Sequence, residues 1–129
     1  MNKRQTPEVL DASALLAWLQ QEEGHQNVRL QGRIMNTVNW SEVVQKSLPT
    51  GIAPEELLTE LEALGLSVHP FSATEAAAAA RLFESGAAAG LSLADRCCLA
   101  SAAVRGGVAI TADRAWGRLD SGVAVRLIR

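Results

Sequence analysis

The sequence has few residues that form disulfides or bind soft metals. Its two cysteines, Cys97 and Cys98, are neighbours, and bridging them would close a strained ring instead of joining distant segments. We therefore expect reduced thiols that fill a core as small apolar groups. Its two histidines, His25 and His69, lie far from the cysteines without the spacing of zinc ligands. The histidines are expected at surface or hydrogen-bonded loop positions, with no role in a site.

The sequence also lacks a strong net charge and long apolar runs. The formal charge is −2, so any nucleic-acid partner must be held locally, for instance through metal ions. No run approaches the roughly 20 apolar residues that a membrane span requires. The polar start MNKRQTPE has no apolar h-region of the kind found in a secretory signal. We expect a cytoplasmic protein without membrane contact.

Apolar residues make up 48% of the 129 residues, which suits one compact domain over residues 1–129. Segments typical of strands alternate with segments typical of helices. The expected strands are residues 8–10, 34–38, 66–69, 108–111 and 123–128. This alternation predicts an α/β fold, a three-layer α/β/α sandwich whose central sheet is mainly parallel.

The starts and ends of several helices can be predicted from capping residues. Ser13 is the expected N-cap of SALLAWL, and Asn39 or Ser41 that of the helix in NWSEVVQKSL. Pro54 suits the first turn before EELLTELEAL, and Gly65 suits its end. Capping boxes are predicted for Ser72 with Glu75 and for Ser92 with Asp95, and Gly106 and Gly107 end the second of these helices. Residues 24–33 have no clean periodicity and are assigned to a helix.

Acidic residues fall where the expected strands end. Asp11 follows the first strand directly, Asp113 follows the strand VAIT by one residue, and Glu42 lies about one turn into the helix after residues 34–38. Ligands of open α/β sheets bind beyond the carboxyl ends of the strands. Asp95 reaches the same edge from the first turn of a helix. We expect these four carboxylates to converge.

Each acid also has a purely structural explanation. Asp11 and Asp95 can cap helices, Glu42 can be a solvated helix residue, and Asp113 can start a turn. Four carboxylates at one edge, however, raise one another's pKa and oppose folding unless a cation compensates them. Mg²⁺ and Mn²⁺ prefer carboxylate oxygens and waters. This pattern indicates a metal-dependent phosphodiesterase.

No histidine or lysine lies near these acids to act as a general base. A metal-activated water is therefore the expected nucleophile, with a second metal steadying the leaving oxygen. Ser13 and Thr111 are expected to orient the ligands or waters by hydrogen bonds.

Four stretches of the chain together resemble the motifs of the PIN-domain family, specifically its VapC-type toxins. They are VLDASALLAWLQQE, MNTVNWSEVV, GLSLADRCCLASA and VAITADRAW. The resemblance implies a Mg²⁺- or Mn²⁺-dependent endoribonuclease for single-stranded RNA, with Asp11, Glu42, Asp95 and Asp113 as its acidic quartet. Thr111 occupies the family's hydroxyl position. The segment HQNVRLQGR departs from the family's usual second helix.

The same resemblance implies the partners. It implies a homodimer and a VapB-type antitoxin whose C-terminal tail covers the active site, with operator DNA bound only through that antitoxin. The RNA target is not specified by the sequence.

Cations and aromatics near the acids are the candidates for substrate contact. Phosphate contacts are predicted for Arg96, Arg114 and Arg118, although a surface ion pair explains each equally well. Trp18 and Trp40 lie within apolar helical patterns and are expected in the core, whereas for Trp116 both core packing and stacking on bases stay open.

Two other functions fit part of the pattern. A phosphatase of the haloacid-dehalogenase type requires a second aspartate where this chain has Ser13, which argues against it. A non-catalytic module whose acidic pocket binds a cation or a basic antitoxin tail stays open.

Overall fold

The strands form one fully parallel sheet. This computed structural model describes residues 6–129, so the start MNKRQ lies outside it. The strands are β1 (Glu8–Leu10), β2 (Ile34–Asn36), β3 (Ser67–His69), β4 (Val108–Thr111) and β5 (Ala124–Leu127). Their order is β3-β2-β1-β4-β5, and every neighbouring pair is parallel. The predicted α/β class is therefore confirmed.

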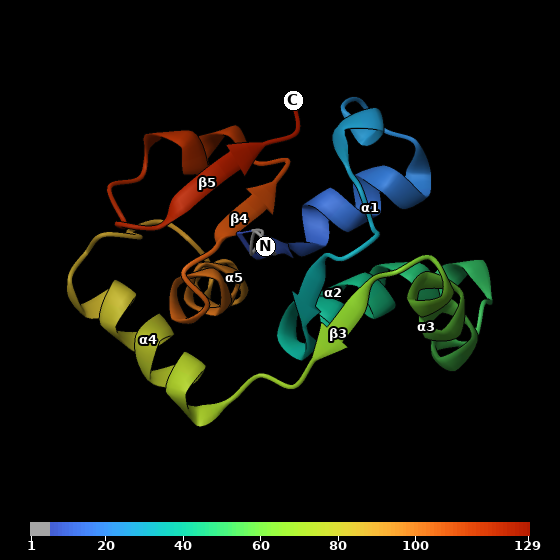
Figure 1. Cartoon of the computed structure of the whole chain (residues 1–129), viewed down its shortest axis with the longest axis horizontal. Coiled ribbons are helices and arrows are strands. Elements are labelled where there is room, and N and C mark those ends of the chain that lie inside the picture. The colour runs from blue at the N-terminus through green and yellow to red at the C-terminus, as the bar shows by residue number, and fades with distance from the viewer. Residues whose placement is uncertain (1–5) are drawn as a thin grey trace, which may run out of the picture.

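Helices cover both faces of this sheet (Figure 1). Adjacent residues of a strand point to opposite faces. In β1, Leu10 packs in the cluster that contains Leu15, whereas Val9 packs with Cys98 on the other face. The predicted three-layer arrangement is thus confirmed, with α4 on the outer side of α5. The helices are α1 (Ala12–Gln20), α2 (Thr37–Ser47), α3 (Pro54–Ala63), α4 (Ala73–Glu84) and α5 (Leu93–Val104), with 3₁₀ turns η1 (His25–Asn27), η2 (Leu48–Thr50) and η3 (Arg114–Arg118).

Two helices begin earlier than the sequence predicts. The N-cap of α1 is Asp11, not Ser13, because the backbone of Asp11 is extended and its side chain accepts from the N–H of Ala14. The N-cap of α2 is Asn36, not Asn39 or Ser41, since Asn36 accepts from the N–H of Asn39. The strand expected over residues 34–38 therefore ends at Asn36. In both cases the last strand residue, or the one after it, caps the helix.

The prediction of a helix over residues 24–33 is wrong. Only the single turn η1 forms there, between Gly24 with φ 88° and an extended Val28. A Cβ on Gly24 would lie 2.5 Å from the carbonyl oxygen of Ile128. Asn27 Nδ2 donates to that same oxygen at 2.9 Å. Contact with the last residues of the chain, and not local periodicity, determines this segment.

Other local predictions hold. Pro54 starts α3, Gly65 follows its end with φ 101°, and capping boxes form at the starts of α4 and α5. Trp18 and Trp40 are partly buried against the core, as expected. Within residues 6–129, no helix has the length and apolar character needed to cross a membrane.

Candidate active site

The candidate site lies where the order of the strands reverses. The chain passes from β1 outward to β2 and β3, then returns to place β4 on the other side of β1. Such a switch point is the usual ligand site of an open parallel sheet. Asp11 directly follows β1 and Thr111 ends β4, so both lie at the carboxyl ends of adjacent strands. The backbone N–H of Asp11 continues the ladder by donating to Ile110 at 3.0 Å.

Asp11 is a buried carboxylate with both oxygens held in place. Its side chain is part of a residue only 4% exposed. Ser13 Oγ lies 2.8 and 2.9 Å from its two oxygens, and Thr111 Oγ1 donates to Oδ2 at 2.6 Å. The N–H of Ala14 donates to Oδ1 at 2.8 Å. Ser13 and Thr111 therefore lie where they were predicted, as hydroxyls that fix this acid.

The pKa of Asp11 is raised from its usual 3.8 to about 6. Burial is the main cause, and the negative charge of Asp95 adds to it. Hydrogen bonds from Thr111, Ala14 and Ser13 lower the pKa in part. The structure thus brings Asp11 and Asp95 close enough for mutual repulsion, which a bound cation would relieve.

Asp95 caps its helix with one carboxylate oxygen and leaves the other oxygen free. Its Oδ2 accepts from the N–H of Ser92 at 3.1 Å, and Ser92 Oγ accepts from the N–H of Asp95 at 3.1 Å. Its Oδ1 has no hydrogen bond within the part of the chain that the structure describes. Capping and metal binding can therefore use different oxygens of one carboxylate.

Glu42 belongs to the same group of charges. Cys98 of α5 is fully buried, and burial raises the pKa of its thiol well above the usual value. The charges of Asp11, Asp95 and Glu42 raise this pKa further. The charges of three of the four predicted acids therefore act on one thiol. Both cysteines are free and buried, as expected, and Cys98 stays protonated.

Asp113 is connected to Asp11 through Thr111. Its N–H donates to Thr111 Oγ1 at 3.1 Å, and that hydroxyl donates to Asp11. Its carboxylate is exposed and accepts from the N–H of Ala115 at 2.9 Å, capping η3. The structure thus places Asp113 at the predicted edge, with its side chain turned toward its own 3₁₀ turn.

The donor set fits a hydrated divalent cation. Among residues 6–129, no three histidine, cysteine or acidic side chains lie close enough to enclose an ion. Mg²⁺ does not need such a cage, because it binds through one or two carboxylates and keeps several waters. Asp11 and Asp95 provide oxygen donors whose mutual repulsion favours a cation. Asp11 and Asp95 would hold it directly or through its waters, and Glu42 through its waters.

The sequence interpretation missed two buried asparagines beside these acids. Asn36 and Asn39 are 0% and 1% exposed and form hydrogen bonds to α5. Both stand in MNTVNWSEVV, where Asn39 was considered only as a cap. A polar residue at the end of an apolar strand was the available signal.

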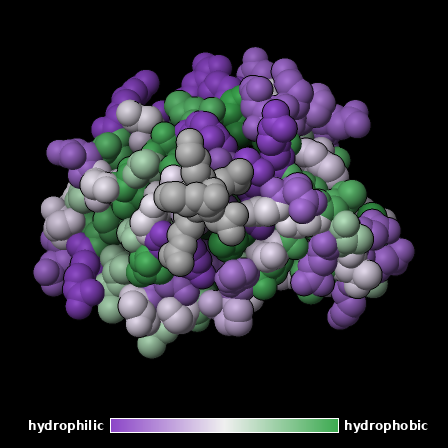
Figure 2. Space-filling view, in the orientation of Figure 1, coloured by the Kyte–Doolittle hydropathy of each residue, from purple (hydrophilic) through white to green (hydrophobic). Residues whose placement is uncertain are grey.

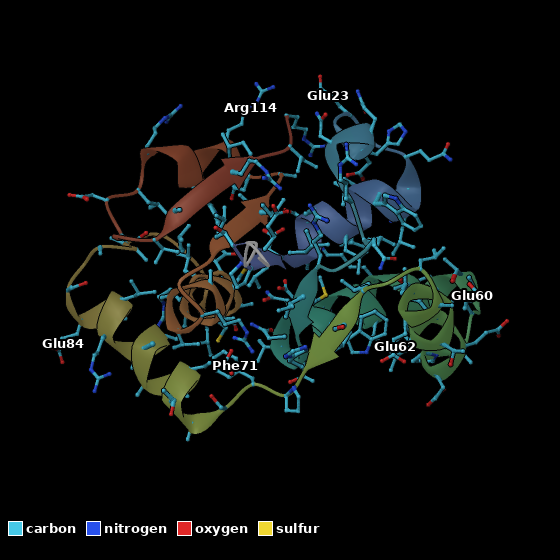
Figure 3. All side chains as sticks on the ribbon, viewed as in Figure 1. Glu23, Glu60, Glu62, Phe71, Glu84 and Arg114 are labelled. Atoms are coloured by element: carbon cyan, nitrogen blue, oxygen red, sulfur yellow. The ribbon has the colours of Figure 1, made fainter. Side chains whose placement is uncertain are left out.

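The three arginines differ in their availability. Arg96 Nη1 donates to the carbonyl of Ala79 at 3.0 Å, and its guanidinium lies 5.0 Å from the centre of the Phe83 ring. Arg114 is exposed and lies 3.9 Å from Glu23, near which Figure 3 shows it. Arg118 is exposed and forms no side-chain hydrogen bond or ion pair within residues 6–129. Arg118 is therefore the least constrained of the three.

Of the two roles left open for Trp116, the structure supports core packing and not stacking on bases. This residue is 1% exposed and packs in the cluster of Val9, Leu99 and Ala109. The turn η3 folds back against β5 and buries the indole.

Hydrophobic residues also reach the surface between α4 and β5 (Figure 2). Leu82 and Val123 line a hollow of about 370 Å³ there, and none of the four acids lines it.

Comparisons with known proteins show which family this chain belongs to. A family model described as "PIN domain" matches residues 9–122. No curated protein matches the chain. Its fold is similar to a toxin–antitoxin complex from Klebsiella pneumoniae, with a TM-score of 0.72, 16% identity, and 95% and 98% of the two chains covered.

Two further solved structures have the same fold. DNA-bound VapBC from Salmonella typhimurium has a TM-score of 0.69 at 18% identity and covers 97% of this chain and 100% of its own. A VapBC family member from Mycobacterium tuberculosis has a TM-score of 0.58 at 22% identity, covering 97% and 99%. At such low identity these likenesses show the fold alone. Because the family model spans most of the sequence, the chain belongs to the PIN domain family.

Proposed function

We propose that this protein is a Mg²⁺- or Mn²⁺-dependent endoribonuclease and the toxin of a toxin–antitoxin pair. The acidic residues of its active site are Asp11, Glu42, Asp95 and Asp113. The observation that carries this proposal is the buried Asp11 at the switch point of the sheet, with its pKa raised to about 6 beside Asp95. An uncompensated carboxylate at such a position opposes folding, and perturbed acids of this kind concentrate at functional sites.

We assign different roles to the hydroxyls, the acids and the arginines of the site. Ser13 and Thr111 donate to Asp11 and hold its carboxylate in one orientation. The free Oδ1 of Asp95 and the carboxylate of Glu42 supply further oxygen donors. When bound, the divalent ion would polarise the phosphodiester and a water molecule. Arg114 and Arg118 are the first and last residues of η3, the turn that Asp113 caps, and they are the cations proposed to contact the RNA backbone.

The proposed partner is a VapB-type antitoxin. Support comes from the similarity in fold to chains of VapBC complexes, one of them bound to DNA. We propose that the antitoxin covers the acidic site, that operator DNA is bound only through the antitoxin, and that the toxin forms a homodimer in the cytoplasm. Expression with and without the adjacent open reading frame tests this, because growth arrest by the toxin should be relieved by its neighbour.

The cleavage test compares the wild-type protein with Asp11→Asn and Asp95→Asn on a panel of single-stranded and structured RNAs. We expect cleavage by wild type with Mg²⁺ or Mn²⁺, none with EDTA, and a loss of at least about 100-fold in both variants. Asp120→Asn is the matched control. Asp120 is exposed and forms no hydrogen bond or ion pair within residues 6–129, so this variant should cleave like wild type.

Equal cleavage by wild type and both site variants would identify a contaminant and end the nuclease proposal. A wild-type protein that binds Mn²⁺ and an antitoxin peptide but cleaves no RNA would instead favour the non-catalytic interaction module. Growth arrest that persists in Asp95→Asn would separate toxicity from RNA cleavage.

A further inference from the structure

Two asparagines connect the helices that carry Glu42 and Asp95. Asn36 ends β2 and Asn39 lies in the first turn of α2, and both are buried almost completely. Buried side-chain amides are rare unless they are hydrogen-bonded. The hydrogen-bond partners of such an amide show which segments of the chain it connects. Both of these side chains donate to groups of α5.

Asn36 has a structural role that uses all of its polar groups. Its Oδ1 accepts from the N–H of Asn39 at 2.7 Å and so caps α2. Its Nδ2 donates to Ser101 Oγ at 2.8 Å and to the carbonyl of Cys97 at 3.2 Å. These bonds dock α2 against the middle of α5.

Asn39 connects the first turns of the two helices. Its Nδ2 donates to the carbonyl of Ala94 at 3.2 Å. Ala94 immediately precedes Asp95, and Asn39 lies one helical turn before Glu42. This single bond therefore joins the two helices next to a proposed ligand on each.

The amide of Asn39 is not explained by stability. Its Oδ1 is buried and has no hydrogen-bond partner among the described residues. An unsatisfied buried acceptor costs about 1–3 kcal/mol, and an apolar side chain of similar shape would avoid that cost. A residue that keeps a polar group at such a cost is a candidate for a role in the site.

We propose that Asn39 is a positioning residue, whose bond to Ala94 sets the separation between Glu42 and Asp95 in the acidic site. This inference rests on the proposed metal-dependent function. Two ligands on separate helices must be held within about 0.5 Å of the productive geometry. The first turns of α2 and α5 have this bond between them, next in sequence to Asp95 and one helical turn before Glu42.

The test measures Mn²⁺ binding by isothermal titration calorimetry in the absence of RNA. Asn39→Ala removes the bond, and Asn39→Leu removes it while keeping the branching and the number of heavy atoms of the side chain. Losing a group that orients metal ligands typically weakens metal binding 10–100-fold, and we expect a loss of about that size in both variants.

Asn27→Ala is the matched control, because Asn27 also donates one side-chain bond to a backbone carbonyl, that of Ile128 at 2.9 Å. It lies outside the acidic site. This control should lower the melting temperature without weakening Mn²⁺ binding.

The outcomes separate the two proposals. If wild type binds Mn²⁺ and both folded Asn39 variants bind it equally well, Asn39 does not position the acids and the nuclease proposal stands. If circular dichroism shows that both variants are unfolded, Asn39 is a folding residue and the positioning role is overturned. A wild-type protein that neither binds Mn²⁺ nor cleaves RNA overturns the proposed function before any variant is compared.

Discussion

Replacing Glu75 with glutamine tests the energetics of the junction between α4 and α5. This buried carboxylate accepts from the N–H of Ser72 at 2.9 Å, from Ser101 Oγ, and from Arg105 Nη1 at 3.0 Å. Burial by itself raises the pKa of Glu75. The hydrogen bonds from Ser101, Ser72 and Arg105 outweigh burial and lower this pKa from 4.5 to about 2.

The expected loss of stability follows from the difference between the folded and the unfolded pKa of Glu75. A pKa that falls by roughly 2.5 corresponds to about 3 kcal/mol of stability. Because the folded pKa lies below the unfolded one, this contribution is present above pH 4.5 and is lost as the pH falls toward 2. Glu75→Gln also leaves Arg105, whose side chain is 21% exposed, without its counterion. We expect the free energy of unfolding at pH 7 to fall by about 3 kcal/mol.

The assay is urea unfolding followed by tryptophan fluorescence at pH 7 and pH 3.5. At pH 3.5, one unit below the unfolded pKa, the difference between wild type and variant should shrink by about 1.4 kcal/mol. Glu84→Gln is the control, since Glu84 ends the same helix and is exposed (Figure 3). It should change stability by less than about 0.5 kcal/mol. A loss below about 1 kcal/mol for Glu75→Gln at pH 7, or one that is equal at both pH values, would refute this reasoning.

Three other substitutions test separate features. Gly107→Ala should lower the melting temperature in differential scanning fluorimetry, with a cost of about 1–3 kcal/mol, because its Cβ would lie 2.3 Å from the carbonyl oxygen of Pro7; an unchanged melting temperature would contradict this close approach. Trp116→Ala should destabilise the fold by about 3–5 kcal/mol in urea unfolding, since the indole is buried; a change in RNA affinity without loss of stability would indicate base stacking after all. Arg118→Gln should raise KM for RNA and lower by about one the slope of log affinity against log salt concentration. Arg126→Gln is the control and should leave this slope unchanged, because Arg126 is paired with Glu8. Equal salt dependence in wild type and Arg118→Gln would remove this arginine from the proposed RNA surface.

Local spacing was enough to predict much of the fold. The box of Ser92 and Asp95 and the stop at Gly65 depend on residues within one turn of each other, and both appear in the structure. The starts of α1 and α2 were misplaced because Asp11 and Asn36 can either end a strand or cap the next helix. Residues 24–33 could not be predicted locally, since their path depends on a distant partner, the carbonyl of Ile128.

The candidate site was predictable in outline for a topological reason. Residues that follow parallel strands share one edge, so Asp11 and Thr111 had to approach one another once the strand order was known. Side-chain direction was not predictable. The carboxylate of Asp113 turns to cap η3, and Trp116 is buried because that turn folds back on β5. These outcomes depend on packing that no short motif encodes.

The burial of both cysteines gives this protein a built-in reporter of local opening. Cys98 packs against Val9 of the sheet, and Cys97 packs against Ala79 of α4. They are 0% and 3% exposed, so a thiol reagent can reach them only when α5 separates from its neighbours. The rate of labelling under native conditions therefore measures how often the helix that carries Asp95 detaches. Since the charges of Asp11, Asp95 and Glu42 all act on Cys98, a cation that holds those acids together should slow its labelling without touching the sulfur. The occupancy of the site can thus be followed without any RNA and without an introduced probe.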